Sequence, residues 1–367
     1  MQVTAAVATA PHAPFDLRVL ELADLAPDEL RVRMTATGVC HTDALVRDQV
    51  YPTPLPAVLG HEGAGVVEEV GPQVRSVRPG DHVVLSFNSC GRCDNCRAGA
   101  PGYCRTLFAL NFSGRRPDGS TTLHDGGTPV SSCFFGQSSF ATHANVAERS
   151  AVRVDPDLPL ELLGPLGCGV LTGAGAVFHT FRPPAGSSLA VFGAGAVGAS
   201  ALLAALAAGC GTVIAVDVLE ARLELARSLG ATHTVDPRAG DPVEQIREIT
   251  GGRGVAYALE ATGLPAVLRQ AADSLDIRGT VGLVGAAAPG TETSFETGMS
   301  LTRGWTLRTI VEGDAVPQVF VPQLIDLWRQ GRFPFDRLVR RYPFARIEDA
   351  FRDSASGAAV KPVLTFG

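Results

Sequence analysis

The chain has 367 residues, which is more than one ordinary domain, so two domains are expected. Hydrophobic residues make up 46% of it and charged residues 19%, which is typical of a well-packed globular protein. The net charge of −6 argues against a nucleic-acid-binding protein, which would need a basic surface. Almost all of the basic residues are arginine, and Lys361 is the only lysine.

The first fifteen residues lack the basic start and the apolar core of a signal peptide, and Pro11 and Pro14 interrupt them. Residues 183–216 carry no charge and imitate a membrane span in composition. Glycines divide this stretch and indicate a strand, a helix and a second strand inside a globular domain. We therefore expect a cytoplasmic protein with no membrane partner.

Two cysteines and one histidine lie in glycine-rich surroundings. Cys40 begins the run Cys-His-Thr-Asp, His61 lies in Gly-His-Glu, and Cys168 lies in Gly-Pro-Leu-Gly-Cys-Gly at 164–169. An isolated cysteine is usually a core residue. Two thiolates and one imidazole with a free fourth position also form a known type of catalytic zinc site. The residues alone leave both interpretations open.

Several aromatic residues in the N-terminal part are candidate walls of a pocket for a flat apolar group. They lie in segments that we expect to be non-helical: Tyr51, Phe87, Phe112 and Phe135. Aromatic rings pack well against an aryl group, although each ring alone is more often a core residue. No charged residue is obvious among them, which disfavours an anionic substrate. Arg115 and Arg116 are expected to lie solvated on a loop.

Four cysteines form the pattern C-x2-C-x2-C-x7-C within residues 88–106: Cys90, Cys93, Cys96 and Cys104. The short gaps let the loop surround one tetrahedral ion. Disulfides fit poorly, because nothing marks the chain as secreted. An iron–sulfur cluster is an alternative, since thiolate spacing does not select the metal, but we favour zinc. A closed four-thiolate site supports structure and not catalysis. Cys133 and Cys210 are expected to be packing residues.

A glycine-rich fingerprint opens the middle of the chain, where an apolar strand leads into a run of alanine and leucine. The fingerprint consists of Gly193, Gly195, Ala196, Val197 and Gly198. Its glycines permit a tight turn, close approach of a pyrophosphate, and close packing of helix on strand. The phosphates would meet the N-terminus of the helix, where N–H groups and the helix dipole favour negative charge. The sequence therefore predicts a dinucleotide site.

Asp217 ends the next strand, nineteen residues after the last glycine of the fingerprint. A carboxylate at this place accepts hydrogen bonds from the adenosine ribose and repels a 2′-phosphate, so NAD is expected rather than NADP. Arg222 could flank the ribose, or it could be a solvated helix residue.

Helices and strands alternate through the middle of the chain. Helices are expected at 219–229, 241–250 and 264–274, and strands at 212–216, 233–235, 255–260 and 279–285. This alternation predicts an α/β protein with a doubly wound parallel sheet. The segments on either side would form the other domain, with the cofactor in the cleft between them. We predict a catalytic domain at 1–169, a dinucleotide-binding domain at 170–310 and a return to the catalytic domain at 311–367.

The run Gly60-His61-Glu62-Gly-Ala-Gly65, with Gly71 and Val74, resembles the signature of the zinc-containing medium-chain alcohol dehydrogenases. The resemblance covers essentially the whole chain, including Lys-Pro-Val-Leu-Thr-Phe at 361–366. Within that family the chain is most similar to the bacterial aryl-alcohol dehydrogenases, on residues 134–140, 164–169 and 311–314. The resemblance implies a GroES-like, mostly β catalytic domain and a Rossmann coenzyme domain.

The resemblance also implies roles for single residues. Cys40, His61 and Cys168 would hold the catalytic zinc, Asp43 would orient His61, and Glu62 would lie behind the metal. Thr42 would place its hydroxyl beside the alcohol. Contacts to the cofactor would come from the pyrophosphate ligands His41 and Lys361 and from the nicotinamide neighbours Thr172, Val284 and Ala286. Two zinc ions per chain, one catalytic and one structural, are therefore expected.

One departure concerns the proton relay. The best-known members of the family carry a histidine a few residues after the Cys-His-Thr-Asp run, whereas residues 44–47 here are Ala-Leu-Val-Arg. The end of the relay is therefore open, and water or the ribose itself could release the proton.

The resemblance implies reversible, NAD-dependent oxidation of primary aryl or terpenoid alcohols to aldehydes. The alternatives are a glutathione-dependent formaldehyde dehydrogenase and a non-catalytic dinucleotide-binding relative, which would have no use for an open zinc position. A homodimer or homotetramer is expected, joined through edge strands near residues 300–312.

Overall fold

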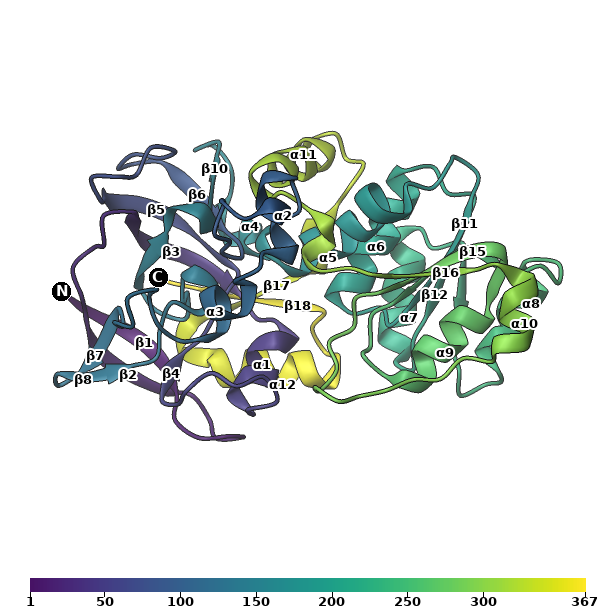
Figure 1. Ribbon diagram of the computed structural model, residues 1–367, viewed down its shortest axis with the longest axis horizontal. Helices are drawn as coiled ribbons and strands as arrows, with labels where there is room; N and C mark the ends of the chain where they lie inside the picture. The colour runs from purple at the N-terminus through teal and green to yellow at the C-terminus, as the bar shows by residue number, and fades with distance from the viewer. The chain divides into compact units, whose positions relative to one another are not determined.

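The computed structural model describes residues 1–367. Contacts divide the chain into two compact units. The first contains Met1–Cys168, Val316–Ile325 and Val339–Gly367, and the second contains Gly169–Ala315 and Asp326–Leu338. Both ends of the chain belong to the first unit (Figure 1).

The predicted division has a single return to the first domain at residue 311, whereas the contacts assign residues 326–338 to the second unit. The side chains of this segment explain the difference. Arg332 donates to the carbonyl oxygen of Ala207 at 3.0 Å, and Arg337 donates to that of Ser228 at 3.0 Å. The chain therefore passes between the units four times, whereas the predicted division has two such passages.

The first unit contains two sheets. One has the strand order β4-β1-β2-β7-β8, and the other has the order β10-β6-β5-β3-β18-β17, with β9 also paired to β3. Neighbouring strands are antiparallel except β17 and β18. The strands are β1 (Gln2–Ala8), β2 (Asp16–Leu22), β3 (Glu29–Gly38), β4 (Ala57–Val58), β5 (Gly63–Val70), β6 (His82–Leu85), β7 (Leu123–Asp125), β8 (Thr128–Val130), β9 (His143–Ala147), β10 (Ala151–Val154), β17 (Val339–Pro343) and β18 (Lys361–Thr365).

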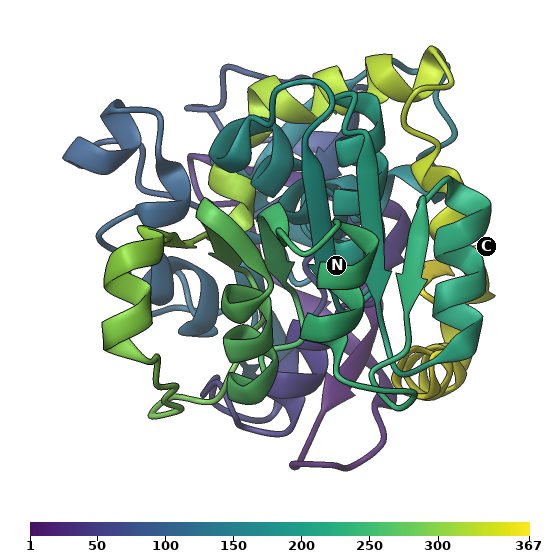
Figure 2. The same cartoon turned by 90° about the vertical axis from the view of Figure 1, so that its right-hand side faces the viewer.

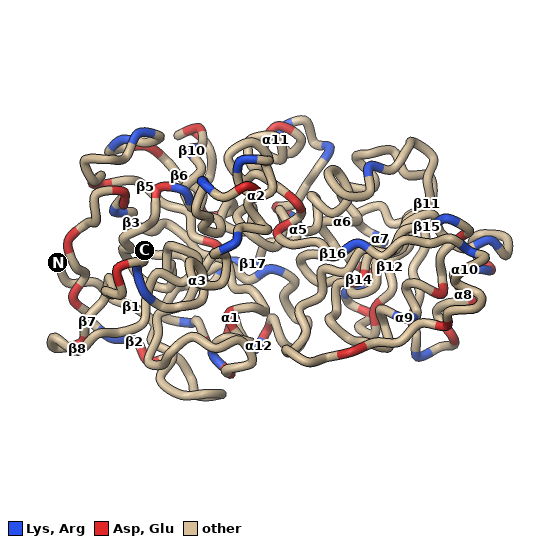
Figure 3. The backbone as a smooth tube through the Cα atoms, in the orientation of Figure 1, with Lys and Arg blue, Asp and Glu red and all other residues tan.

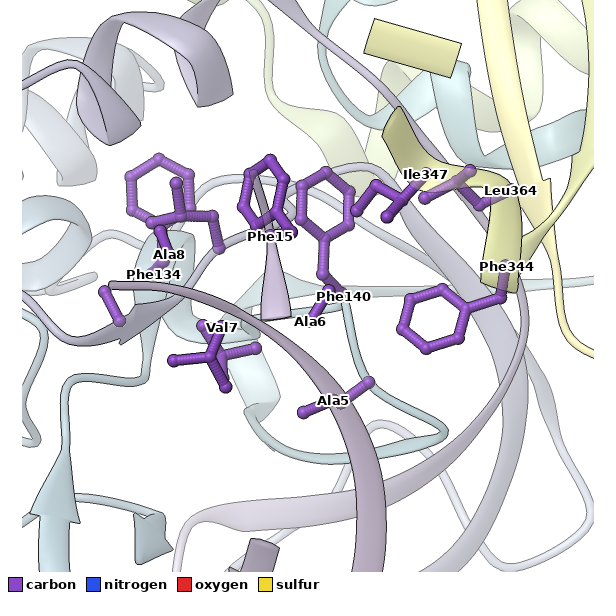
Figure 4. Close-up of a cluster of buried hydrophobic side chains, with 14 of the residues drawn as sticks. Ala5, Ala6, Val7, Ala8, Phe15, Phe134, Phe140, Phe344, Ile347 and Leu364 are labelled. Atoms are coloured by element: carbon purple, nitrogen blue, oxygen red, sulfur yellow. The ribbon is translucent and has the colours of Figure 1, made fainter. Parts of the chain in front are cut away.

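Short helices complete the first unit: α1 (His41–Arg47), α2 (Asp94–Arg97), α3 (Leu107–Phe112), α4 (Leu160–Leu163) and α12 (Ile347–Ser356). Its core joins β1 to α12 through aromatic rings (Figure 4). Phe140 packs edge-on against Phe15 at 5.8 Å between ring centroids, and against Phe351 at 6.0 Å. Each Å² of apolar surface that these rings bury contributes roughly 25 cal/mol to the stability of the unit. The buried rings lie near the segment that carries His61, since Phe140 adjoins Gly60.

The second unit has a parallel sheet of six strands in the order β13-β12-β11-β14-β15-β16. The strands are β11 (Ser188–Phe192), β12 (Thr212–Val216), β13 (His233–Val235), β14 (Val255–Glu260), β15 (Leu275–Leu283) and β16 (Thr306–Thr309). The helices are α5 (Gly169–Gly175), α6 (Ala196–Ala207), α7 (Glu220–Leu229), α8 (Pro242–Ile249), α9 (Pro265–Asp273) and α10 (Thr297–Arg303), and α11 (Pro317–Arg329) contributes residues to both units. Figure 2 shows helices on both sides of this sheet.

The predicted α/β fold is confirmed, because the strand order reverses at β11 as in a doubly wound sheet. The elements predicted in the middle of the chain are present, and β12, β13 and β14 have the predicted bounds. The strand expected at 279–285 begins four residues earlier, at Leu275, because its start pairs with Val255 across a register shift.

The uncharged stretch at 183–216 forms β11, α6 and the strand β12, as expected. No single helix is long and apolar enough to cross a membrane. One bent pair of helices, Leu160–Gly167 with Gly169–Phe181, has the length and composition of a membrane span, but these two properties are its only resemblance to one. Acidic and basic residues are interspersed along the chain in both units (Figure 3).

Candidate metal and dinucleotide sites

Four side chains of the first unit converge on one point. The ligand atoms of Cys40, His61, Glu62 and Cys168 all lie within 4.8 Å of one another. Cys40 lies directly before α1, His61 lies between β4 and β5, and Cys168 follows a short 3-10 helix. Gly60 has a φ of 88°, and a side chain there would collide with Phe140, so only glycine lets the chain turn before His61. The predicted catalytic cluster is therefore assembled from distant segments.

Asp43 fixes the orientation of His61. One carboxylate oxygen lies 2.9 Å from His61 Nδ1 and accepts from the Gly60 N–H at 3.1 Å, while the other accepts from the Cys40 N–H at 3.0 Å. Both side chains are fully buried. Since Nδ1 is held by the carboxylate, the ring turns Nε2 away from it, and Nε2 is buried with no hydrogen-bond partner.

The thiols beside this nitrogen are suited to a soft cation. A hydrogen bond from Cys168 and the neighbouring charge of His61 hold the pKa of the Cys40 thiol well below its usual value, against the effect of burial. A thiolate is the form that binds metal. The orphaned His61 Nε2 and two thiols therefore fit a zinc ion, and Glu62 lies within reach of the same point.

Thr42 lies beside this cluster, with its hydroxyl 3.8 Å from the Cys40 sulfur. The predicted place of the hydroxyl is therefore consistent with the geometry. Residues 44–47, where the relay histidine is missing, lie in α1. Arg47 in that helix pairs with Asp48 at 2.7 Å and lies over the rings of Phe15 and Phe351, so it is not available as a base.

Lys361, the single lysine, is buried in the first unit. Its Nζ donates to both carboxylate oxygens of Glu62, at 2.8 and 2.9 Å, and to the carbonyl oxygen of Val39 at 3.1 Å. Burial disfavours the ammonium, but the charge of Glu62 outweighs it and raises the pKa of Lys361. All three donors are engaged, so the predicted contact to a pyrophosphate would require one of these bonds to break. His41, the other predicted phosphate ligand, is exposed at the start of α1.

A loop at residues 133–140 encloses the backbone of His61. Gln137 Nε2 donates to the carbonyl oxygens of His61 and Ser86, and Gln137 Oε1 accepts from the Gly63 N–H. The loop contains three non-glycine residues with left-handed φ values, Cys133, Phe135 and Ser138. Such backbone strain persists only where the surroundings enforce it, and here the strained loop wraps around the main chain of His61. Residues 134–140 contribute to the family resemblance, but no pattern in the sequence indicates the contacts of Gln137.

Three of the four predicted pocket aromatics form one network around His61. Phe135 stacks on the His61 ring at 4.5 Å, Phe112 packs on Phe135 at 5.2 Å, and Tyr51 packs on Phe112 at 6.1 Å. Phe134, which the sequence analysis missed, lies edge-on to His61 at 5.4 Å. Phe87 is buried in the core of the unit.

Two expectations about this region are wrong. Phe112 was expected outside a helix but is the last residue of α3. Arg116 was expected to be solvated, yet it is largely buried and forms an ion pair with Glu29 at 2.6 Å. Burial of a paired charge requires such a partner, and sequence proximity to Arg115 concealed it. Arg115 itself is exposed.

The second group of cysteines forms its own cluster. The sulfur atoms of Cys90, Cys93, Cys96 and Cys104 lie within 4.8 Å of one another, and no disulfide is formed. N–H groups of Arg92 and Cys93 lower the pKa of Cys90 to about 6, whereas burial and the neighbouring thiols raise the pKa of Cys96 to about 12. A cation at the centre would remove this conflict between thiolates. Cys133 and Cys210 are buried away from both clusters, as expected.

The fingerprint lies at the C-terminal end of β11 in the second unit. Gly193 has a φ of 94°, and a side chain on Gly198 would collide with the Gly193 carbonyl, so both places require glycine. The space over Gly195 is open: an added Cβ would meet nothing within 4 Å. Because α6 begins at Ala196, its first N–H groups adjoin this space, which fits a pyrophosphate.

Asp217 follows β12 and is buried. Its carboxylate accepts from the N–H groups of Ala194 at 2.8 Å and Leu219 at 2.9 Å, and Arg222 lies 3.5 Å away. Each oxygen of a carboxylate can accept a second bond, so the ribose hydroxyls remain possible donors. Arg222 turns toward the carboxylate, and its Nε is buried without a partner.

The predicted neighbours of the nicotinamide also lie in the second unit. The N–H of Val284 donates to the carbonyl oxygen of Glu260 at 3.0 Å, which fixes the backbone that leads to Ala286. Thr172 is buried in α5, and its hydroxyl donates to Glu312 at 3.3 Å. No sequence pattern indicates this contact of Glu312.

Comparison with known proteins identifies the family of the chain. The model of the alcohol dehydrogenase GroES-like domain matches residues 26–156, and that of the zinc-binding dehydrogenase matches residues 196–329. The chain therefore belongs to the zinc-containing medium-chain alcohol dehydrogenase family, whose members are enzymes that use zinc and a nicotinamide cofactor.

Particular relatives are close. The chain is 52% identical to geraniol dehydrogenase of Castellaniella defragrans, over 92% of this chain and 91% of that protein. The structure of a zinc-binding-domain alcohol dehydrogenase protein from Burkholderia ambifaria is 56% identical, with a TM-score of 0.98 over 100% of this chain and 99% of that one. Benzyl alcohol dehydrogenase from Acinetobacter calcoaceticus is 47% identical, with a TM-score of 0.97 over 100% of both chains.

Proposed function

We propose that this alcohol dehydrogenase oxidises primary aryl or allylic terpenoid alcohols to aldehydes with NAD, using a zinc ion held by Cys40, His61 and Cys168. The observation that carries the proposal is the orphaned Nε2 of His61, which faces two thiols and lies against aromatic rings. Buried nitrogen atoms without a partner are rare and costly, so this one calls for a ligand. The names of the geraniol and benzyl alcohol dehydrogenases support the same substrate class.

When bound, zinc would supply a Lewis acid for the alcohol oxygen and the nicotinamide would supply the hydride acceptor. Cys40, His61 and Cys168 would hold the ion with three ligands, which would leave room for the alcohol oxygen to bind it. Asp43 holds His61 in the tautomer that presents Nε2. The Thr42 hydroxyl would accept the alcohol proton as it passes its own proton on to water or the nicotinamide ribose. Phe134 and Phe135, which lie against the His61 ring, would flank the apolar group of the alcohol.

The cofactor residues belong to the second unit. The first turn of α6 holds the pyrophosphate over Gly195, and the Asp217 carboxylate holds the ribose. Thr172 and the backbone at Val284–Ala286 flank the nicotinamide. A 2′-phosphate beside the buried carboxylate of Asp217 would place like charges together, which favours NAD over NADP.

Two zinc ions per chain are part of the proposal, the second held by Cys90, Cys93, Cys96 and Cys104 in a structural role. A homodimer or homotetramer in the cytoplasm is also proposed. β16 is the last strand of its sheet, and the exposed apolar side chains of Met299, Leu301 and Leu307 near it would be covered by a second copy.

The test is to follow NADH formation with benzyl, cinnamyl, geraniol-like and short aliphatic alcohols, and with the glutathione adduct of formaldehyde. The proposal expects the aryl and allylic alcohols to have the highest kcat/KM. Highest activity on the glutathione adduct would favour the formaldehyde dehydrogenase instead. Metal analysis of the same preparation should find two zinc ions per chain. A single zinc ion per chain would contradict the catalytic assignment.

Asp217→Asn tests the cofactor preference. The Ala194 and Leu219 N–H groups bond to different carboxylate oxygens, so asparagine keeps an acceptor for one of them while it removes the charge. We expect the ratio of NAD to NADP activity to fall about tenfold, because the repulsion of a 2′-phosphate is lost. Asp241→Asn, a helix cap elsewhere in the second unit, is the control. An unchanged ratio in Asp217→Asn would show that this carboxylate does not select the cofactor.

A further inference from the structure

Three successive residues of the second unit have a left-handed backbone. The φ values are 50° for Glu312, 65° for Gly313 and 51° for Asp314. Left-handed conformations are unfavourable for residues with a side chain, so Glu312 and Asp314 are strained. The segment 311–314 is also the Val-Glu-Gly-Asp run on which the family resemblance partly rests, and the proposed function gives it no role.

Contacts to one helical segment hold these three residues in place. Asp314 accepts from the Thr180 hydroxyl at 2.6 Å, and the Gly313 carbonyl oxygen lies 3.2 Å from His179 Nδ1. A side chain on Gly175 would collide with Gly313, so the two backbones touch. Thr180 and His179 belong to a π-helix, residues 176–181, that directly continues α5. π-Helical turns are often found at functional sites.

Glu312 makes a similar contact at an earlier point of the same helical segment. Its Oε2 accepts from the hydroxyl of Thr172 at 3.3 Å, and Thr172 is almost fully buried in α5. Asp314 and Gly313 already attach the segment to the helix, so the strain at Glu312 is not needed for attachment. Glu312 therefore supplies a carboxylate in hydrogen-bond contact with Thr172, and the proposed function places the nicotinamide beside Thr172.

We propose that Glu312 is a selectivity residue whose carboxylate, hydrogen-bonded to Thr172, strengthens the binding of the oxidised nicotinamide dinucleotide relative to that of the reduced one. The inference rests on the proposed function for the place of the nicotinamide. The oxidised ring carries one positive charge and the reduced ring carries none. A half-buried carboxylate therefore attracts one form and is indifferent to the other. Stronger binding of the oxidised form, with weaker retention of the reduced form, favours turnover in the direction of alcohol oxidation.

The alternative is that Glu312 is only a hydrogen-bonded tether for Thr172. The two roles separate when the charge is removed and the hydrogen-bond acceptor is kept, as in Glu312→Gln. Asp314→Asn is the matched control, because it makes the same change in charge, in the same segment, at a carboxylate that also accepts from a threonine of the same helical segment. Glu312→Asn is a second neutral variant, since asparagine tolerates a left-handed φ.

The measurement is the dissociation constant of NADH, from its fluorescence on binding, and that of NAD, from competition against NADH. We expect Glu312→Gln and Glu312→Asn to raise the ratio of the NAD constant to the NADH constant about fivefold, as for the loss of one partly screened charge. Asp314→Asn should leave the ratio unchanged. The shift should shrink at high salt if the carboxylate is reached by solvent.

If the Glu312 variants bound NAD and NADH more weakly by the same factor, Glu312 would act only as a tether for Thr172. This result would overturn the inference. The same shift in Asp314→Asn would overturn it too, because the effect would then belong to the charge of the whole segment. These outcomes leave the proposed function intact. Failure of the parent protein to bind either dinucleotide would remove the proposed function, and the inference with it.

Discussion

The two cysteine clusters of the first unit are built in opposite ways. The cluster of Cys90, Cys93, Cys96 and Cys104 comes from one short loop and is only partly buried. The cluster of Cys40, His61 and Cys168 is drawn from three distant segments, and its histidine is fully buried. The first depends on local spacing. The second depends on the folding of the whole unit, and this lets a surrounding network control each ligand.

The two clusters also differ in the side chains that surround and hold their ligands. At the dispersed cluster, Asp43 orients the histidine, Gln137 holds its backbone, and the Glu62–Lys361 pair lies beside the thiols. At the loop cluster, Asn111 joins the two ends of the loop by bonds to Asn88 and Leu107. A site that performs chemistry needs its ligands fixed against movement, whereas a structural ion can fix the loop by itself.

The largest expected effect comes from removing one ligand of each cluster. Cys168→Ala should lower the zinc content from two ions to one and reduce kcat/KM by at least about a thousandfold, which corresponds to roughly 4 kcal/mol of lost transition-state stabilisation. Cys96→Ser should also leave one zinc ion but retain most of kcat, with a melting temperature lower by about 5 °C. Metal analysis, steady-state kinetics and calorimetry on both variants check this.

Cys210→Ala is the control, because Cys210 is a buried cysteine that belongs to neither cluster. It should change neither the zinc content nor kcat/KM. If Cys96→Ser and Cys168→Ala lost activity equally, the division of the clusters into structural and catalytic would be wrong.

The second prediction concerns the buried pair beside the dispersed cluster. Lys361→Met leaves the Glu62 carboxylate buried without its cation, which should cost about 3–5 kcal/mol of unfolding free energy. Adding Glu62→Gln to the same chain should recover much of this loss, because no uncompensated charge remains. Urea unfolding of the two variants measures the difference.

The same variants test the predicted contact of Lys361 with the cofactor. If Lys361 serves mainly the pyrophosphate, Lys361→Met should weaken dinucleotide binding and leave the stability nearly unchanged. A large loss of stability with little change in binding would assign the only lysine to Glu62.

The contrast between the clusters also explains how much the sequence could predict. Spacing alone identified the loop cluster, because its four residues lie within one short segment. Cys40, His61 and Cys168 could be joined only through the family resemblance, since no local pattern shows that three distant segments meet. The alternating elements of the second unit were predictable for a similar reason, because each βα unit is local. Apart from β15, the observed bounds differ from the predicted ones by at most one residue.

What could not be predicted depends on side chains that meet in space. Lys361 pairs with Glu62, Arg116 pairs with Glu29, and Gln137 bridges three backbone groups near His61. These partners lie far apart in the chain, and a buried charge is compensated by whichever residue the fold brings to it. The left-handed residues at 312–314 were also hidden, because glutamate gives no sign of a positive φ.

The smallest effect concerns how firmly each ion is held. Gln137→Leu removes the three bonds to the backbone around His61, and Asn111→Leu removes the matching bonds at the ends of the cysteine loop. Each is expected to speed the release of zinc to a chelator about tenfold, the effect usual for a group that supports metal ligands. Gln137→Leu should release the ion on which activity depends, so activity should decay with the zinc. Asn111→Leu should release zinc while activity persists. If activity fell together with the zinc content in both variants, the two clusters would not be held independently. The contrast between a local and a dispersed site would then have no functional meaning.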